Sequence, residues 1–215
     1  MGKIRIYRRV PPGEVLDLLD RRALFVSRWG YGSIDQRQRL VLESKLTAMW
    51  GELSSPEHWS AGTVWAPFNA RLDGDNLTLE GAVPKTQFCL KPDKLPVAIL
   101  LGLKNRKKVV LQAVTLGRAA TRLSKSKKGA EDRLYWHGLA AEAAEALAEW
   151  CSRRANGEMG WKGCRRISPG FPAWPELSEQ RKIFRALRPG RIGVRLSRSC
   201  QMMPEYSTSA AVFTI

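Results

Sequence analysis

The stretch RRISPGFPAWPELSEQRKIFRALRPGRIGVRLSRSCQMMPEYSTSAAVFTI, residues 165–215, is the most informative part of this chain. Its first portion, residues 166–175, contains an arginine, three prolines, a glycine and two aromatic residues. Proline fixes φ and removes a backbone donor, whereas glycine gives access to positive φ. We therefore predict a rigid, shaped segment with free backbone N–H and C=O groups that face a ligand. Beside this segment, Arg166 carries a planar, permanently charged guanidinium group that can bind a carboxylate or a phosphate with two hydrogen bonds.

This stretch resembles the C-terminal activation domain of cobalamin-dependent methionine synthase, and more closely the short, free-standing relatives of that domain. The matching patterns are R-x-[SA]-P-G-[YF]-P-A-x-P from residue 166, SEQRKIF at 178–184 and RIGVRLSRSCQMMPEYSTSA at 191–210. Weaker matches lie upstream in AVTLG at 113–117 and AAEALAEW at 143–150. The resemblance is strongest over residues 143–215, and we expect residues 1–215 to form one activation-like domain.

The resemblance implies a function. Methionine synthase cycles its corrinoid between cob(I)alamin and methylcobalamin, and cob(I)alamin is occasionally oxidised to inactive cob(II)alamin. The family's activation domain binds S-adenosyl-L-methionine and docks over the cobalamin domain. An electron from flavodoxin or a similar acidic carrier, followed by methyl transfer from S-adenosylmethionine, restores methylcobalamin. The cofactor carries the hard chemistry, and the protein supplies position and electrostatics.

This chain contains no corrinoid-binding D-x-H-x-x-G motif and no self-contained active site. We therefore expect a reactivation module that acts on a separate corrinoid-binding methionine synthase module or a related corrinoid protein. The sequence leaves open whether this module is an enzyme, as an accessory component of the methyltransferase methionine synthase. Cobalamin is expected on the partner protein.

The resemblance also implies residues that hold the amino-acid end of S-adenosylmethionine. Arg166 matches the family arginine that grips the methionyl carboxylate. Glu145 matches the family glutamate, which accepts a hydrogen bond from the α-ammonium group. Asp20, in LDRRALF, is aligned with the family's N-terminal aspartate, which has the same role.

The adenosine and sulfonium end is expected to lie along Ser168, Pro169 and Gly170, which match the family's strand-like segment there. Phe171 stands where the family usually has tyrosine, so a hydroxyl contact is lost while the ring remains available to face the corrinoid. A second family tyrosine falls near Val212. These departures leave open a docking or regulatory module that keeps the fold without binding S-adenosylmethionine.

The net charge of +16, from 36 Lys and Arg against 20 Asp and Glu, predicts an anionic partner. An acidic flavodoxin or corrinoid domain would fit this charge, because complementary charge steers association. A basic nucleic-acid-binding protein is the alternative hypothesis, since eight tryptophans are available for base stacking. It is the less favoured one because the sequence has no RNP aromatic pattern, no GXXG loop in the appropriate context and no zinc-ligand spacing.

Other patterns in the sequence bear on membrane insertion, cellular location and metal binding. No apolar run approaches the roughly 18 to 20 residues needed to cross a bilayer. The basic N-terminus lacks the apolar stretch of a secretory signal, so a cytoplasmic protein without a membrane partner is expected. The four cysteines are too far apart for a zinc site, so free thiols and no metal are expected.

Apolar spacing predicts an α+β fold. Helices are expected over Glu14–Val26, Ile34–Leu53, Glu131–Arg154 and Ser178–Leu187, with Ser33 and Ser178 as N-caps. Strands are expected over Thr63–Phe68, Asn76–Leu79, Lys94–Leu103, Lys107–Leu116, Val194–Leu196 and Ser209–Thr214, with turns at Asp73-Gly74 and Asn105. Since βαβ alternation is absent, the sheet should be antiparallel. The family fold adds a single compact, curved domain in which helices flank a twisted antiparallel sheet.

Three glutamates of the longest predicted helix, Glu142, Glu145 and Glu149, share one stripe at helical spacing. By composition alone, a solvated helix face is the favoured interpretation of this stripe. The family resemblance singles out Glu145 from it.

Overall fold

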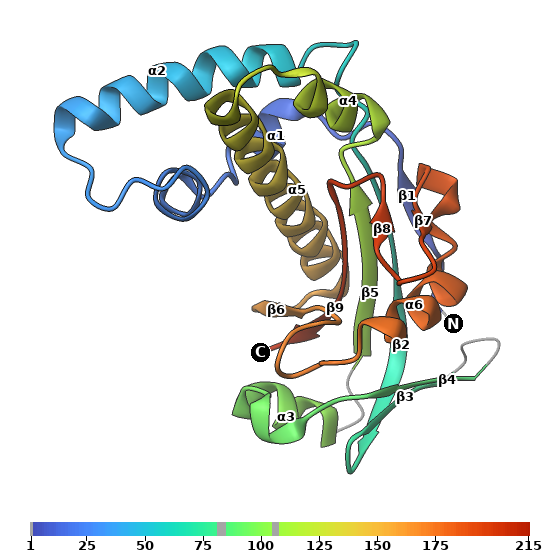
Figure 1. The fold of residues 1–215 in the computed structure, drawn as a ribbon. Coiled ribbons are helices and arrows are strands. Elements are labelled where there is room, and N and C mark those ends of the chain that lie inside the picture. Colours follow the sequence, from blue (N-terminus) through green and yellow to red (C-terminus); the bar gives the residue numbers. More distant parts are fainter. Residues whose placement is uncertain (1, 81–84, 105–107) are drawn as a thin grey trace.

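The computed structural model describes residues 2–80, 85–104 and 108–215 (Figure 1). Its strands are β1 (Arg5–Tyr7), β2 (Gly62–Asp73), β3 (Asn76–Glu80), β4 (Thr86–Cys89), β5 (Lys108–Thr115), β6 (Cys164–Ile167), β7 (Arg195–Leu196), β8 (Met202–Met203) and β9 (Ser207–Thr214). Seven of them form one antiparallel sheet in the order β4-β3-β2-β5-β9-β6, with β1 paired to β2. Strands β7 and β8 form a separate two-stranded sheet.

The α-helices are α1 (Pro12–Leu16), α2 (Gln36–Leu53), α3 (Val97–Lys104), α4 (Arg118–Ser126), α5 (Ala130–Met159) and α6 (Gln180–Leu187). A π-helical segment η1 (Ala23–Arg28) and the 3₁₀ turns η2 (Pro92–Lys94), η3 (Leu177–Glu179) and η4 (Pro189–Ile192) complete the elements. Helix α5 runs across the sheet, and it ends at Gly160 in the left-handed conformation.

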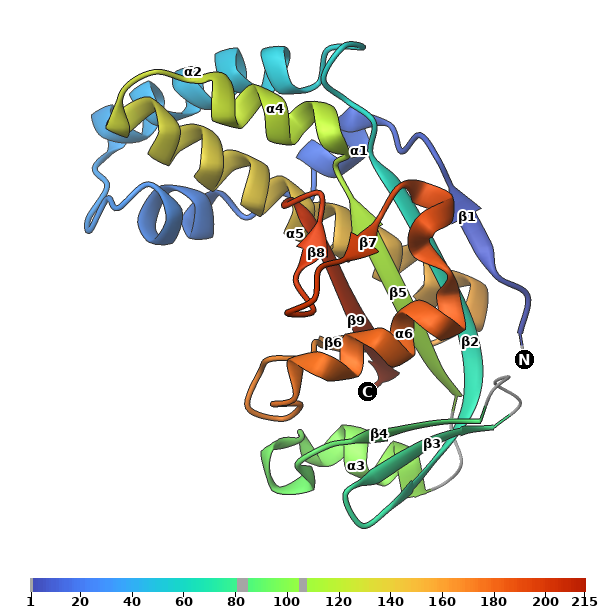
Figure 2. The ribbon, with the colours of Figure 1, turned by 45° about the vertical axis from the view of Figure 1, so that its right-hand side comes forward.

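The sheet is covered on both faces, as its alternating side chains require. On β2, Trp65 packs into the core beneath α5, whereas Val64 and Phe68 pack into a second core with α3 and α6. Figure 2 shows α6 crossing the face of the sheet opposite to α5. On the α5 side, the Gln112 side chain donates to the Ala148 carbonyl at 3.1 Å, which ties the sheet to the helix.

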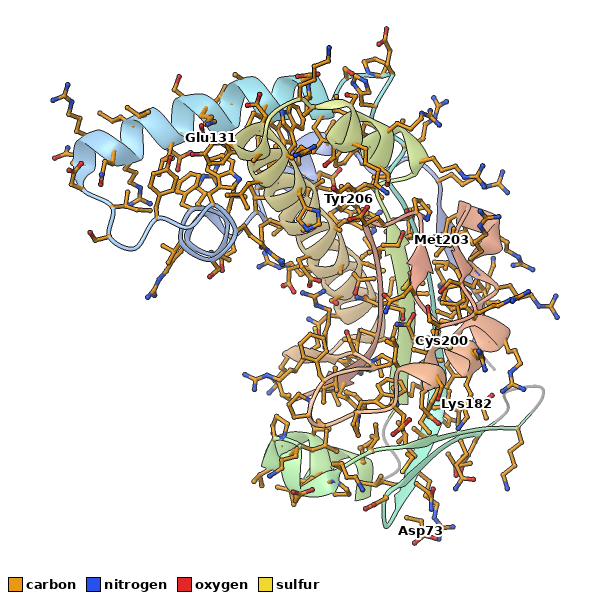
Figure 3. The ribbon with its side chains drawn as sticks, viewed as in Figure 1. Asp73, Glu131, Lys182, Cys200, Met203 and Tyr206 are labelled. Atoms are coloured by element: carbon orange, nitrogen blue, oxygen red, sulfur yellow. The ribbon has the colours of Figure 1, made fainter. Side chains whose placement is uncertain are left out.

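The outline is curved because α2 and α3 project from opposite ends of the sheet toward the same side (Figure 1). Glu131, at the start of α5, lies beside α2 at one end, and Asp73, on the β2–β3 hairpin, lies at the other (Figure 3). The expected α+β architecture, a single domain around an antiparallel sheet, is confirmed. Within the described residues, no helix has both the length and the apolar character that crossing a membrane requires.

The predicted strand over Lys94–Leu103 is wrong, because the segment forms helix α3. Pro96 accepts backbone bonds from Ile99 and Leu100, which closes the first turn. Ile99 and Leu103 are buried four residues apart, so the apolar run packs only one helical side against the sheet. The predicted turn at Asn105 lies outside the described residues.

Several helix boundaries and caps differ from expectation. The helix predicted over Glu14–Val26 divides into α1 and η1, with irregular residues between them. Helix α2 is capped by Asp35 rather than Ser33: the Gln38 N–H donates to Asp35 Oδ1 at 2.7 Å, and the Gln38 side chain accepts from the Asp35 N–H. Ser178 does not cap α6 either, since it lies inside η3.

Candidate functional site

The loop that follows β6 is held by its own hydrogen bonds. Gly170 has φ +91°, a conformation that favours glycine, and its N–H donates to the Trp174 carbonyl at 2.7 Å. The Trp174 N–H donates in turn to the Phe171 carbonyl at 2.8 Å. The expectation that these backbone donors face a ligand is therefore wrong for Gly170 and Trp174, because the loop uses them to fix its shape.

The same loop is anchored to the hairpin side of the sheet. The Trp174 ring is fully buried and meets Phe88 of β4 edge-to-face, with ring centroids 4.8 Å apart. The Lys91 N–H donates to the Ala173 carbonyl at 2.9 Å. These contacts attach the loop to β4 and to the segment that follows β4, so Ser168, Phe171, Pro172 and Ala173 are held along one wall of a cleft.

The cleft has a volume of about 610 Å³, which is within the usual range for small-molecule sites. Its walls come from η1, η2, the residue before α3, α5, β6 and the loop after β6. The lining residues are Arg28, Lys94, Pro96, Glu145, Arg165, Arg166, Ile167, Ser168, Phe171, Pro172 and Ala173. Four cationic side chains and one carboxylate therefore face the cleft, which makes it electropositive.

Arg166 and Glu145 meet in this cleft. Strand β6 places Arg166 opposite Val212 of β9, and α5 crosses the same face. Arg166 Nη1 lies 3.3 Å from Glu145 Oε2, and Arg166 Nε lies 3.9 Å from Glu149 Oε2. Both partners are partly exposed, so the pair presents a cation and a carboxylate side by side to a ligand.

A second ion pair lies on the neighbouring turn of α5. Arg28, the last residue of η1, has its Nε 3.3 Å from Glu142 Oε2. The Glu142 side chain is only 7% exposed, so the solvated-face interpretation of this stripe is wrong for Glu142. Burial raises the pKa of the Glu142 carboxyl above its ordinary value of 4.5, and the Arg28 guanidinium partly opposes that rise.

The structure brings together four of the seven predicted site residues: Arg166, Glu145, Ser168 and Phe171 all line the cleft. Pro169 is buried and Gly170 is exposed, and both shape the loop without lining the cleft. Asp20 is exposed and also absent from the lining. Its Oδ1 accepts a hydrogen bond at 2.9 Å from the N–H of Ala23, the first residue of η1. Asp20 remains close enough to add to the rise in the Glu142 pKa.

The two departures noted in the sequence have different structural consequences. Phe171 is 63% exposed at the cleft, so its ring is accessible from solvent. Val212 is fully buried in the core beneath α5. Arg28 and Lys94 were not anticipated, since no motif links either residue to the loop.

Residues 104–215 match the family described as "Vitamin B12 dependent methionine synthase, activation domain". This match covers more than half of the chain. The chain belongs to this family. The cleft therefore lies in an activation domain, and family membership favours the reactivation hypothesis over the nucleic-acid alternative.

Relatives of this activation domain include two mycobacterial methionine synthases. The Mycobacterium tuberculosis protein is 31% identical over 257 aligned residues, which cover 97% of this chain and 22% of the relative. The Mycobacterium leprae protein is 33% identical over 102 residues, which cover 38% of this chain and 8% of the relative. The activation domain thus spans about a fifth or less of the length of these relatives.

A solved structure described as the MetH reactivation domain bound to AdoHcy has the same fold. The superposition has a TM-score of 0.79 at 19% sequence identity, and it covers 99% of this activation domain and 78% of that chain. The similarity therefore includes the N-terminal half of the chain, which the family match leaves out.

Proposed function

We propose that this domain binds S-adenosylmethionine in the cleft and supports reductive remethylation of cob(II)alamin on a corrinoid-binding methionine synthase module. The observation that carries the proposal is the Arg166–Glu145 pair, which the fold places in the cleft from positions matching the family's ligand residues. The solved structure with this fold is described as bound to AdoHcy, the demethylated product of the same ligand.

The residues of the cleft fit the chemistry of the ligand. The Arg166 guanidinium is suited to the α-carboxylate, and the neighbouring Glu145 carboxylate is suited to the α-ammonium group. The Phe171 ring offers a negative π face to a sulfonium cation, an interaction that needs no hydroxyl. Ser168 and the loop held by Trp174 provide the edge for the adenosine.

The bound ligand would supply the methyl group that remethylation of the partner's cobalamin requires. This chain's own contribution is to bind and orient the ligand at the mouth of the cleft, where exposed Phe171 would face the corrinoid. The net charge of +16 supports acidic partners, both for the corrinoid module and for an electron donor such as flavodoxin.

Calorimetric titration of S-adenosylmethionine and of S-adenosylhomocysteine tests the proposal. Arg166→Ala should weaken binding of both ligands at least tenfold, because it leaves a ligand carboxylate and Glu145 without their cation. Arg153→Ala is the matched control, since Arg153 also pairs with Glu149, at 2.8 Å, but does not line the cleft.

The control should bind both ligands like the wild type, and circular dichroism should show that both variants are folded. If the wild type binds neither ligand at millimolar concentration, the proposal is wrong. The docking module without S-adenosylmethionine binding would then be the better hypothesis.

A further inference from the structure

Arg28 provides a second guanidinium group in the cleft, and only one of its nitrogen atoms has a hydrogen-bond partner among the described residues. Its Nε contacts Glu142 at 3.3 Å, while the described residues give its two Nη groups no hydrogen bond. Its side chain is 39% exposed and lines the same cleft as Arg166. A guanidinium carries five N–H donors in a fixed fork, so most of this binding capacity remains available to a ligand.

The position of Arg28 is set by close packing on α5. A Cβ added at Gly138 would lie 3.0 Å from Arg28 Cβ and 2.9 Å from Trp29 Cδ1. The absence of a side chain at Gly138 therefore lets the end of η1 approach the helix. Trp29 Nε1–H donates to the Tyr135 carbonyl at 3.0 Å, inside the core, and fixes this approach.

Glu142 orients the guanidinium of Arg28. It follows Gly138 by four residues, so it lies one turn farther along α5 on the same side. A carboxylate that is 7% exposed is unfavourable unless it is paired, and Arg28 is the ion-pair partner that the described residues provide. The pairing occupies Arg28 Nε and leaves the Nη groups for the cleft.

The cleft therefore has two ion pairs on successive turns of α5: Arg28 with Glu142, and Arg166 with Glu145. Lys94 and Arg165 add further positive charge to the lining. This excess favours a carboxylate on the ligand and opposes a ligand that carries only cationic groups.

We infer that Arg28 is a second carboxylate-binding residue, positioned by Glu142, which makes the cleft select S-adenosyl ligands that retain their α-carboxylate. The inference rests on the proposed function and deepens it. It assigns Arg28 to ligand selection, whereas the family resemblance assigns carboxylate binding to Arg166 alone.

The test compares two ligands that differ only in the carboxylate, S-adenosylmethionine and decarboxylated S-adenosylmethionine, by calorimetry. Arg28→Gln should weaken S-adenosylmethionine binding about tenfold, as expected for one lost charge-assisted pair, and should leave the decarboxylated ligand within twofold of the wild type. Arg22→Gln is the control, because it removes the same charge next to η1, and Arg22 does not line the cleft. It should leave the ratio of the two affinities unchanged.

Equal weakening of both ligands by Arg28→Gln would assign Arg28 a structural role and overturn the inference. An unchanged ratio would also overturn it. If Arg28→Gln does not fold because Glu142 loses its partner, the double variant Arg28→Gln, Glu142→Gln removes the unpaired charge, and the same loss of selectivity is expected from it.

The outcomes separate this inference from the proposed function. If the wild type binds neither ligand, both fail. If it binds S-adenosylmethionine in an Arg166-dependent way while Arg28→Gln keeps the wild-type ratio, only the role of Arg28 is wrong.

Discussion

At the scale of single residues, the buried carboxylate of Glu142 lowers the stability of the folded protein and also orients Arg28. Its pKa is raised chiefly by burial, so the folded protein holds this proton more tightly than the unfolded chain. At neutral pH the buried Glu142 carboxylate is charged, and its desolvation destabilises the folded protein. This destabilisation disappears as the pH falls through the folded-state pKa toward the ordinary value of 4.5.

Glu142→Gln should consequently raise the free energy of unfolding at pH 8, because it removes a buried charge whose desolvation outweighs the pairing with Arg28. The gain should shrink as the pH is lowered toward the ordinary carboxyl value of 4.5. Urea denaturation at several pH values measures it. A difference from the wild type that stays constant with pH would contradict the prediction.

Glu158→Gln is the control on the same helix. Glu158 is partly exposed and pairs with Arg5 at 3.0 Å. Its replacement should change stability by no more than about 0.5 kcal/mol at any of these pH values, as is usual for surface positions.

The residues of the cleft divide into those that the sequence could reveal and those that it could not. Arg166 and Ser168 belong to one short pattern, and Glu145 is recognised through its helix motif. Arg28 reaches Glu142 across 114 residues of sequence, and no local pattern encodes that contact. The family resemblance points to Asp20, but its hydrogen bond to Ala23 depends on the irregular path into η1, which helical periodicity does not reveal.

At the scale of elements, Gly117 determines how α4 leaves the sheet. It precedes α4 with φ +88°, and a Cβ there would lie 1.9 Å from Ser60 Oγ. Gly117→Ala combines backbone strain with a steric clash, so it should destabilise the protein by about 2 to 4 kcal/mol. Equilibrium unfolding in urea measures the loss.

Gly157→Ala is the same substitution at a position where it causes neither backbone strain nor a steric clash. Gly157 lies within α5, and an added Cβ would meet nothing within 4 Å. Because alanine is the better helix former, the variant should gain up to about 1 kcal/mol. A loss at Gly157 similar to that at Gly117 would show that the conformation of Gly117 is not the cause.

Among the elements, periodicity located the long helix α5 and strands β2, β5 and β9, since each packs a regular apolar pattern. It failed at α3, because a short apolar run bounded by turns is compatible with either a strand or a helix. It also missed β1 and β6, which are three and four residues long and pair at the margins of the sheet. Segments this short contain too few residues to show a periodic pattern.

At the scale of the whole molecule, the charge of +16 predicts how partners associate. The proposed binding of an acidic flavodoxin should weaken at least tenfold between about 50 and 300 mM salt, because screening shortens the range of the steering field. Binding of S-adenosylmethionine should respond far less, since its ion pairs lie within a cleft. Surface-based binding measurements and calorimetry at matched salt concentrations test both statements.

Heparin and RNA of similar charge provide the comparison for that experiment. The reactivation hypothesis expects no preference for RNA over heparin, because only charge would attract either polyanion. A strong preference for RNA would support the nucleic-acid alternative instead.

The position of β5 has a consequence for the whole fold. Residues 104–215, which the family match covers, include β5 and β9 but not β2, which pairs with β5 from Gly62 to Asn69. Without β2, the apolar strand β5 would be an open edge, and such edges recruit other chains. The matched part of the sequence alone would therefore leave an edge open to edge-to-edge aggregation, and β2, from the part outside the match, covers that edge.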